Sequence, residues 1–212
     1  MSKLDSAEVD HAFFSKVTPL SSYIAGFIAA DGCIVNDRVL QVSVNVKDQV
    51  HLQKMLKHMK SNANLGYGKD NTAKFSIPST QIAADLLRHY NITPRKSLTL
   101  EPPNITGKDN IKAFISGYID GDGCFRYGSR SKDGNWKYLV LEVIGTRRFL
   151  EWMNNNLPVT GSVRDIDTYA RLALTCAKAY AAYNYLWDPS LPLLERKWDN
   201  RYKIYTGEKH GS

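Results

Sequence analysis

The sequence lacks any apolar run of the roughly 20 residues that a membrane-spanning helix needs. Its first residues, MSKLDSAEVDHAFF, are polar and acidic and contain no continuous apolar core of the kind that a signal peptide carries. We therefore expect a soluble intracellular protein with no membrane partner, in a bacterial or phage-host cytoplasm or in an organelle matrix.

Cysteine is scarce. The three cysteines, Cys33, Cys124 and Cys176, form no CxxC pair and no Cys/His ligand spacing, which argues against a thiolate metal centre and a disulfide framework. We expect them to be small buried apolar residues in a reducing compartment. The histidines His51, His58 and His89 fall in helical stretches, where we expect surface or boundary positions without a functional role.

Charge of one sign is in excess. Lysine and arginine number 28 against 21 acidic residues, which gives a net charge of +7 and a pI near 9.2. This balance favours a polyanionic partner such as nucleic acid. Hydrophobic residues make up 43% of the chain, enough for a globular core.

The chain contains an internal repeat. The stretch SSYIAGFIAADGCI (Ser21 to Ile34) matches KAFISGYIDGDGCF (Lys112 to Phe125) at an offset of 91 residues. Further along, VSVNVKDQVHLQKML matches LVLEVIGTRRFLEWM at an offset of 97, and the extra six residues fall in the polar turn SRSKDGNW. The repeat predicts an N-terminal extension (1–18), a first repeat (19–100), a Pro/Gly/Asn-rich linker (101–110), a second repeat (111–205) and a C-terminal tail (206–212).

Each repeat has the pattern αββαββα, which predicts an α+β fold. In the first repeat, Val42, Val44 and Val46 alternate with polar residues, as in a strand with one buried face. Asp48 then precedes an amphipathic helix and is a candidate N-cap, or alternatively a polar residue that orients water. Strands of this kind form antiparallel sheets with helices on the apolar face only, and two such sheets side by side leave a long polar saddle.

The repeated helices carry small residues at helical spacing. This set consists of Ser22, Ala25, Gly26, Ala29 and Ala30, and in the second repeat of Ala113, Ser116, Gly117 and Gly121. We expect the two helices to pack closely along these residues, while the large apolar residues beside them face each repeat's own core.

An acidic residue ends each of these helices, where the backbone dipole is already negative. If the helices pack in parallel, Asp31 and Asp122 meet, together with the terminal carbonyl groups of Ala30 and Gly121. Carboxylate and carbonyl oxygens are the ligands of a hard divalent cation, Mg²⁺ or Ca²⁺. The pattern predicts a metal site held by these four residues.

The segments IAGFIAADG and ISGYIDGDG resemble the two motifs of the LAGLIDADG homing endonucleases, in the single-chain form. The resemblance extends from about Leu20 to Tyr205, and it includes NITPRKSLTLEPP at the end of the first repeat. The first motif departs from the family at its sixth position, where Ala29 replaces the acid that Asp120 retains. The eighth position, the metal-binding acid, is intact in both motifs.

The resemblance implies divalent-metal-dependent hydrolysis of both strands of a DNA duplex, with a staggered break. Asp31 and Asp122 would be catalytic, with Mg²⁺ as cofactor, Mn²⁺ as a substitute, and Ca²⁺ binding without efficient cleavage. The family also places a basic residue beside each site, which makes Lys96 and Lys197 the catalytic candidates here.

The polar faces of the predicted strands, and the longer polar turn of the second repeat that carries Arg130 and Lys132, supply the candidate DNA contacts. These are Gln41, Ser43, Asn45, Lys47 and Lys74 in the first repeat, and Arg126, Arg130, Lys132, Tyr138, Glu142 and Arg171 in the second. Because these two sets differ, we expect a monomer that recognises a long, non-palindromic site.

Other functions stay open at this stage. An RNA maturase that binds intron RNA, or a DNA-binding regulator, could use the same fold without cleavage. An intein-borne nuclease lacks support because no splicing blocks flank the repeats. A binder of acidic proteins or membrane surfaces would need a basic amphipathic helix, which we do not find.

Overall fold

The structure is a computed structural model, and it describes residues 8–129 and 137–198. The helices are α1 (Pro19–Asp31), α2 (Gln49–His58), α3 (Thr80–Tyr90), α4 (Lys108–Asp122), α5 (Arg147–Asn155) and α6 (Ala177–Leu186). The strands are β1 (Gly32–Val35), β2 (Val39–Asn45), β3 (Gly66–Gly68), β4 (Thr72–Pro78), β5 (Gly123–Ser129), β6 (Lys137–Gly145), β7 (Ser162–Ile166) and β8 (Tyr169–Thr175). Short 3₁₀ helices lie at η1 (Val46–Asp48), η2 (Lys96–Leu98) and η3 (Glu195–Lys197).

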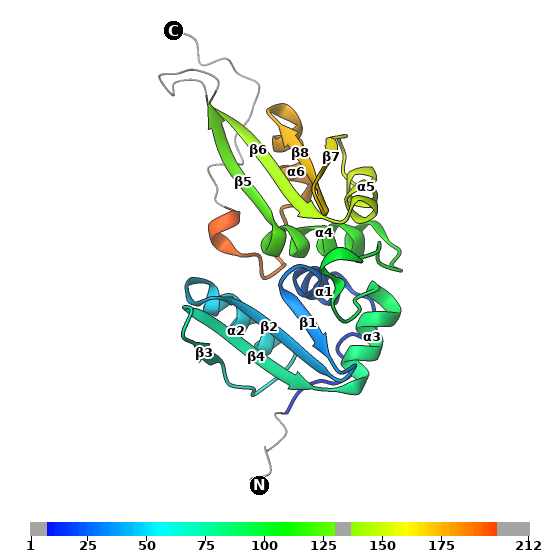
Figure 1. Ribbon diagram of the computed structural model, residues 1–212, viewed down its shortest axis with the longest axis vertical. Coiled ribbons are helices and arrows are strands. Elements are labelled where there is room, and N and C mark those ends of the chain that lie inside the picture. Colours follow the sequence, from blue (N-terminus) through cyan, green and yellow to red (C-terminus); the bar gives the residue numbers. More distant parts are fainter. Residues whose placement is uncertain (1–7, 130–136, 199–212) are drawn as a thin grey trace.

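The predicted αββαββα repeat is confirmed. Two four-stranded antiparallel sheets have the matching orders β1-β2-β4-β3 and β5-β6-β8-β7. In Figure 1 the sheets occupy opposite ends of the molecule, and α1 and α4 lie side by side between them. The two halves thus share one architecture, joined through their first helices.

Alternation of side chains places the core. Along β2 the residues Leu40, Val42 and Val44 are buried while Gln41, Ser43 and Asn45 are exposed. β4 repeats this pattern, with Ala73, Phe75 and Ile77 buried. Each sheet therefore has an apolar face packed beneath helices and a polar face that the helices leave open, as predicted.

Helix α1 begins where its capping residues require it. The Thr18 hydroxyl accepts a hydrogen bond from the Ser21 amide, the Ser21 hydroxyl accepts one from the Thr18 amide, and Pro19 occupies the first helical position. The preceding residues also pack on the first half, since Phe14 is fully buried and the Asp10 amide donates to the Met59 carbonyl at 2.9 Å.

Within the described residues, no helix is both long enough and apolar enough to cross a membrane.

Candidate active site at the ends of the two central helices

Helices α1 and α4 approach each other through glycine. A Cβ added to Gly26 would clash with the backbone of Phe114, and one added to Gly117 would clash with the backbone of Tyr23. The contact is therefore backbone against backbone, which places the small-residue face at the interface between the halves.

Both central helices pass directly into a strand. Gly32 follows Asp31 with φ −97°, and Gly123 follows Asp122 with φ −108°, both in extended conformation. These glycines are required by space and not by a left-handed turn, because an added Cβ would collide with Ile28 and Ile119 respectively. The tight junctions fix the two preceding carboxylates at the helix ends.

Asp31 and Asp122 come together across the interface. A Cβ on Gly121 would lie 3.3 Å from Asp31 Oδ2, so the end of α4 lies against the Asp31 carboxylate. Partial desolvation and repulsion from Asp122 raise the pKa of Asp31 to about 6, against its ordinary value of 3.8. Desolvation also raises the pKa of Asp122. Both side chains remain open to solvent.

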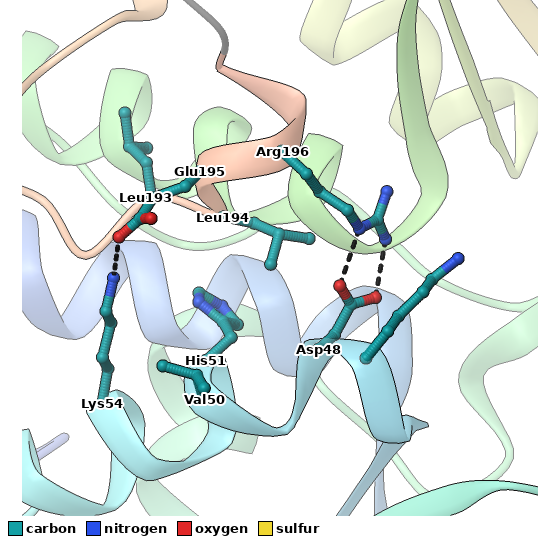
Figure 2. Close-up of a pocket in the computed structure, with 9 residues that line it drawn as sticks. Asp48, Val50, His51, Lys54, Leu193, Leu194, Glu195 and Arg196 are labelled. Carbon is teal, nitrogen blue, oxygen red and sulfur yellow. Dashed lines mark hydrogen bonds and ion pairs between the residues drawn. The ribbon is translucent and has the colours of Figure 1, made fainter.

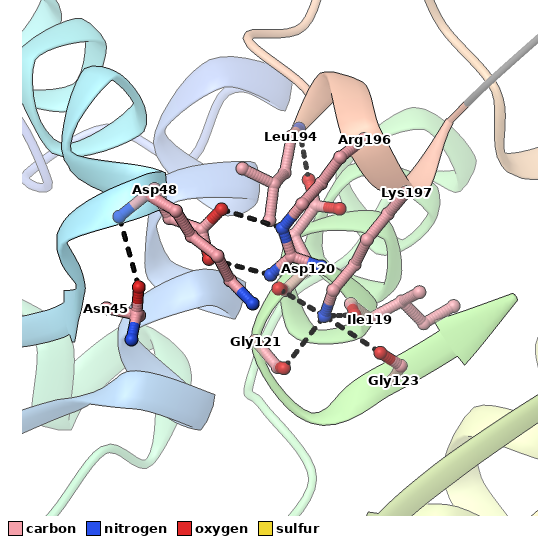
Figure 3. Close-up of polar contacts among 10 residues, drawn as sticks. Asn45, Asp48, Ile119, Asp120, Gly121, Gly123, Leu194, Arg196 and Lys197 are labelled. Carbon is pink, nitrogen blue, oxygen red and sulfur yellow. Dashed lines mark hydrogen bonds and ion pairs between the residues drawn. The ribbon is translucent and has the colours of Figure 1, made fainter.

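A lysine lies beside each helix end. The Lys96 ammonium group donates to the carbonyl oxygen of Gly32 at 2.6 Å, and that of Lys197 donates to the carbonyl oxygens of Asp120 (2.6 Å), Gly121 (2.9 Å) and Gly123 (2.8 Å). Figure 3 shows this convergence at Lys197. Lys96 is buried and Lys197 half-buried, and desolvation lowers both pKa values. The structure therefore brings each candidate lysine to a candidate acid.

The donor set suits a divalent cation with oxygen ligands. Within the described part of the chain, no three His, Cys, Asp or Glu side chains gather into a metal-binding group, so carbonyl oxygens and water would complete the coordination. Desolvation raises the pKa of both carboxylates, and repulsion from Asp122 adds to the shift of Asp31; a bound cation would stabilise the charged form of both. The Gly121 carbonyl oxygen is shared with Lys197, and the Ala30 carbonyl oxygen lies 3.4 Å from the Lys96 ammonium nitrogen.

Asp120, next to the site, has a different environment. Its carboxylate is 2% exposed and accepts hydrogen bonds from the Tyr23 hydroxyl (2.5 Å), the Leu194 amide (2.9 Å) and the Trp198 indole (2.6 Å). Burial raises its pKa to about 6, although these hydrogen bonds oppose the shift. Asp120 therefore anchors residues 194–198, which we call the C-terminal segment. The sequence did not reveal this role.

Tyr23 belongs to the large residues that we expected to face their own half's core. Its ring does pack against His51 of that half, with 6.0 Å between the ring centroids, but its hydroxyl group also crosses the interface to Asp120. A tyrosine among small residues on a buried helix face is the signal that could have indicated this, because a buried hydroxyl needs a partner.

Asp48 is not a side-chain N-cap of α2. It occupies the cap position but makes no capping hydrogen bond. Instead, both carboxylate oxygens accept hydrogen bonds from Arg196, at 2.7 Å from Nε and 2.7 Å from Nη2. Figure 2 shows this pair beside a second ion pair, between Lys54 and Glu195 at 2.6 Å. The first half thus binds the C-terminal segment of the second half through two ion pairs.

Two other residue types differ from expectation. His51 is 3% exposed, and burial lowers its pKa to about 4, so it is a core residue and not a surface one. Cys33 and Cys124 are exposed because they alternate with the buried residues of β1 and β5. They lie on the polar sheet faces, immediately beyond the two acids.

The candidate DNA-contacting residues divide into three groups. Exposed positions on the polar faces hold Gln41, Ser43, Asn45, Lys74 and Arg126, with Tyr138, Glu142 and Arg171 partly exposed. Lys47 is exposed but belongs to η1 rather than to a strand. Arg130 and Lys132 lie outside the described residues.

Charged side chains of the second sheet already pair with one another. Glu142 accepts hydrogen bonds from Arg126 Nε (3.0 Å) and Nη2 (2.9 Å), and from Arg171 Nη1 at 3.3 Å. In the first sheet the residue opposite Cys33, as Glu142 is opposite Cys124, is the uncharged Gln41, and nearby Asn45 accepts from the Lys47 amide at 3.1 Å. The two polar faces therefore differ in charge as well as in sequence.

The fold is that of the LAGLIDADG homing endonucleases. The chain is similar to the LAGLIDADG meganuclease I-AabMI bound to uncleaved DNA, with 15% identity, a TM-score of 0.59, and coverage of 86% of this chain and 87% of that one. It is also similar to the meganuclease I-SmaMI (14% identity, 80% and 82% coverage, TM-score 0.57) and to the LAGLIDADG homing endonuclease I-LtrWI bound to target DNA (16%, 77% and 80%, 0.56). No protein-family model and no curated protein sequence matches the chain.

Proposed function

We propose that this chain is a LAGLIDADG homing endonuclease, which makes a staggered double-strand break in a long, non-palindromic DNA site by divalent-metal-dependent hydrolysis. The observation that carries the proposal is the paired site, in which two helices end together in Asp31 and Asp122 with Lys96 and Lys197 beside them.

The arrangement of the two halves supports a DNA substrate. Each sheet leaves a polar face open, and the chain carries a net charge of +7. By size scaling, two halves of about 35 Å each cover on the order of 20 base pairs of duplex. The solved structures of I-AabMI and I-LtrWI contain DNA, which is consistent with this substrate.

Metal dependence is supported by chemistry and by relatives. I-SmaMI has been solved with DNA in the presence of calcium ions. When bound, a divalent cation such as Mg²⁺ would stabilise the charge on the attacking and leaving oxygens. Asp31 and Asp122 would hold such cations, helped by the carbonyl oxygens of Ala30 and Gly121.

The lysines would act through charge. Hydrolysis joins a water oxygen to phosphorus and breaks one phosphorus–oxygen ester bond, and negative charge grows on the phosphate oxygens as this happens. Lys96 and Lys197 hold ammonium groups beside the acids, where they offset the negative helix ends and attract the phosphate.

A cleavage selection tests the proposal. A randomised duplex library is incubated with the protein and Mg²⁺, and the cut ends are sequenced. We expect one long asymmetric site with a staggered break. The matched control is the Asp31→Asn, Asp122→Asn double variant, and cleavage of both strands by that variant would contradict the assignment of these acids. Absence of any cutting by the wild-type protein, with tight binding to intron RNA, would favour the maturase alternative.

A further inference from the structure

The two candidate lysines are held in different ways. Lys197 belongs to η3, which lies at the junction of the halves in Figure 1. Its neighbour Arg196 forms the bidentate pair with Asp48, in which the Asp48 side chain is 9% exposed. Bidentate pairs of arginine and carboxylate fix geometry as well as contribute energy, because two parallel hydrogen bonds define one orientation.

The residues around Lys197 are secured on both sides. Glu195 binds Lys54 of α2 at 2.6 Å, while Leu194 and Trp198 both bind the buried Asp120 carboxylate. Trp198 is adjacent to the lysine but binds its own half, and Glu195 binds the other half but is two residues away. Within this short segment, Arg196 is therefore the residue that both adjoins Lys197 and binds the first half. Figure 3 shows Arg196 directed to Asp48 and Lys197 directed to the end of α4.

Lys96 lacks the corresponding support. Its neighbour Arg95 is exposed and makes no hydrogen bond or ion pair within the described residues. Asp48 occupies the N-cap position of α2, and the matching N-cap of α5 is Thr146. The Thr146 side chain carries no charge: it accepts a hydrogen bond from the Phe149 amide and donates one to the Leu100 carbonyl oxygen at 2.6 Å, so it cannot form an ion pair with Arg95.

We propose that Asp48 is a positioning residue that, through Arg196, holds Lys197 against the end of α4, and that only one of the two active-site lysines is positioned in this way. The significance of Lys197 rests on the proposed function, but its positioning does not. It follows that loss of Asp48 slows cleavage of one DNA strand more than of the other.

Chemical modification of the metal-free, DNA-free protein tests the positioning directly. Limited acetylation with acetic anhydride, followed by mass spectrometry, gives a separate rate for each lysine. In Asp48→Asn and in Arg196→Gln we expect Lys197 to react about tenfold faster, which corresponds to a coupling of about 1.4 kcal/mol, while Lys96 is unchanged. The double variant should exceed neither single one, because both remove the same contact.

The matched control is Arg95→Gln, at the pseudo-symmetric position, which should leave the rates of both lysines unchanged. An unaltered Lys197 rate in Asp48→Asn and Arg196→Gln would overturn the proposal. So would an equal rise at both lysines, which would indicate general loosening, or a matching rise of Lys96 in the control.

A second measurement connects positioning to catalysis. On a supercoiled plasmid that carries the selected site, Asp48→Asn should accumulate nicked circles in Mg²⁺, and the uncut strand should be the one that Lys197→Ala also spares. Equal slowing of both strands would overturn the link. If the wild-type protein cuts no DNA while the acetylation result holds, the proposed function fails and the positioning stands.

Discussion

At the contact between α1 and α4, equivalent positions hold a polar pair of side chains on one side of the pseudo-twofold axis and an apolar pair on the other. In the second half, Asp120 of α4 meets Tyr23 of α1 in a buried hydrogen bond. The matching residues across the pseudo-twofold relation are Ala29 and Phe114, both buried and apolar. A polar pair and an apolar pair are each self-consistent, whereas a mixed pair would leave a buried polar group without a partner.

The polar pair of the second half also holds the segment that carries Lys197, whereas the segment that carries Lys96 is held elsewhere. Asp120 also binds the Leu194 amide and the Trp198 indole, so its carboxylate orders the segment that carries Lys197. The segment after α3 instead crosses to the second half further along, where the Thr146 hydroxyl donates to the Leu100 carbonyl at 2.6 Å. Similar folds can therefore position equivalent lysines by unequal means.

The features shared by the halves should produce the largest effect. We expect Asp31→Asn or Asp122→Asn to reduce double-strand cleavage roughly a thousandfold or more, because each change removes one of the two proposed anionic metal ligands. Binding of the selected duplex, measured by gel shift in Ca²⁺, should persist. Efficient double-strand cutting by either variant would show that the acids are not paired in function.

The close helix contact should be next in size. Gly26→Ala and Gly117→Ala each place a Cβ against opposing backbone, and such overpacking costs about 1–3 kcal/mol of unfolding free energy or more. The control is Gly66→Ala on β3, where the nearest atom would be 3.8 Å away. Urea unfolding midpoints measure the difference, and equal midpoints in all three variants would contradict the interface.

The buried hydrogen bonds of Asp120 have no equivalent in the first half, and their removal should destabilise the protein. Asp120→Ala leaves the Leu194 amide and the Trp198 indole without their acceptor, at a cost of roughly 2–4 kcal/mol. Adding Tyr23→Phe to Asp120→Ala should cost little more, since the pair then resembles Ala29 and Phe114. A double-mutant cycle by urea unfolding measures this coupling, and full additivity would mean that the two side chains act independently.

The sequence predicted the repeated part of the molecule and missed the unique part. Duplication revealed the fold, the central helix pair and both acids, because a feature that occurs twice distinguishes itself from chance. Contacts between non-equivalent positions have no such signal. Asp48 and Arg196 are 148 residues apart, and local reasoning assigned Asp48 to the nearest helix start.

Burial of individual side chains was the other limit. Cys33 looks apolar by type, yet strand alternation places it on the open face, and His51 lies in the core although its type favours the boundary. The metal ligands and DNA contacts remain predictions, since their roles depend on groups that bind the protein.

A smaller effect should appear in pH dependence. The folded-state pKa of Asp31, about 6, exceeds its ordinary 3.8, so the native protein binds this proton more tightly than the unfolded chain does. The metal-free protein therefore loses stability from this group as pH rises from about 4 to 6. Asp31→Asn should raise the melting temperature at pH 7 by about 2–4 °C, assuming about 1 kcal/mol after solvent screening, with no gain near pH 4.

Mg²⁺ should reverse the order of the melting temperatures, so that the wild-type protein melts above Asp31→Asn. The wild-type protein gains stability by binding the cation, while Asp31→Asn gains less. Thermal scans at pH 7 with and without Mg²⁺ provide the check, and a variant that is stabilised equally by the cation would remove Asp31 from the metal site.

The smallest expected effect concerns the two polar faces. Arg171 on β8 lies opposite Ile144 of β6, and it binds Glu142 together with Arg126. Its counterpart in the first sheet, Lys74, lies opposite Ser43 of β2. Arginine suits guanine and is worth about 1–3 kcal/mol of discrimination when it binds a base bidentately. We expect Arg171→Ala to relax preference at one or two base pairs of one half-site, and Lys74→Ala to affect the other half-site. Selection profiles of the three proteins on a randomised duplex measure this directly. Because the faces differ in both sequence and internal ion pairing, the recovered site should be asymmetric and cut by a monomer; a palindromic site, or an obligate dimer of this chain, would mean that one face is read twice.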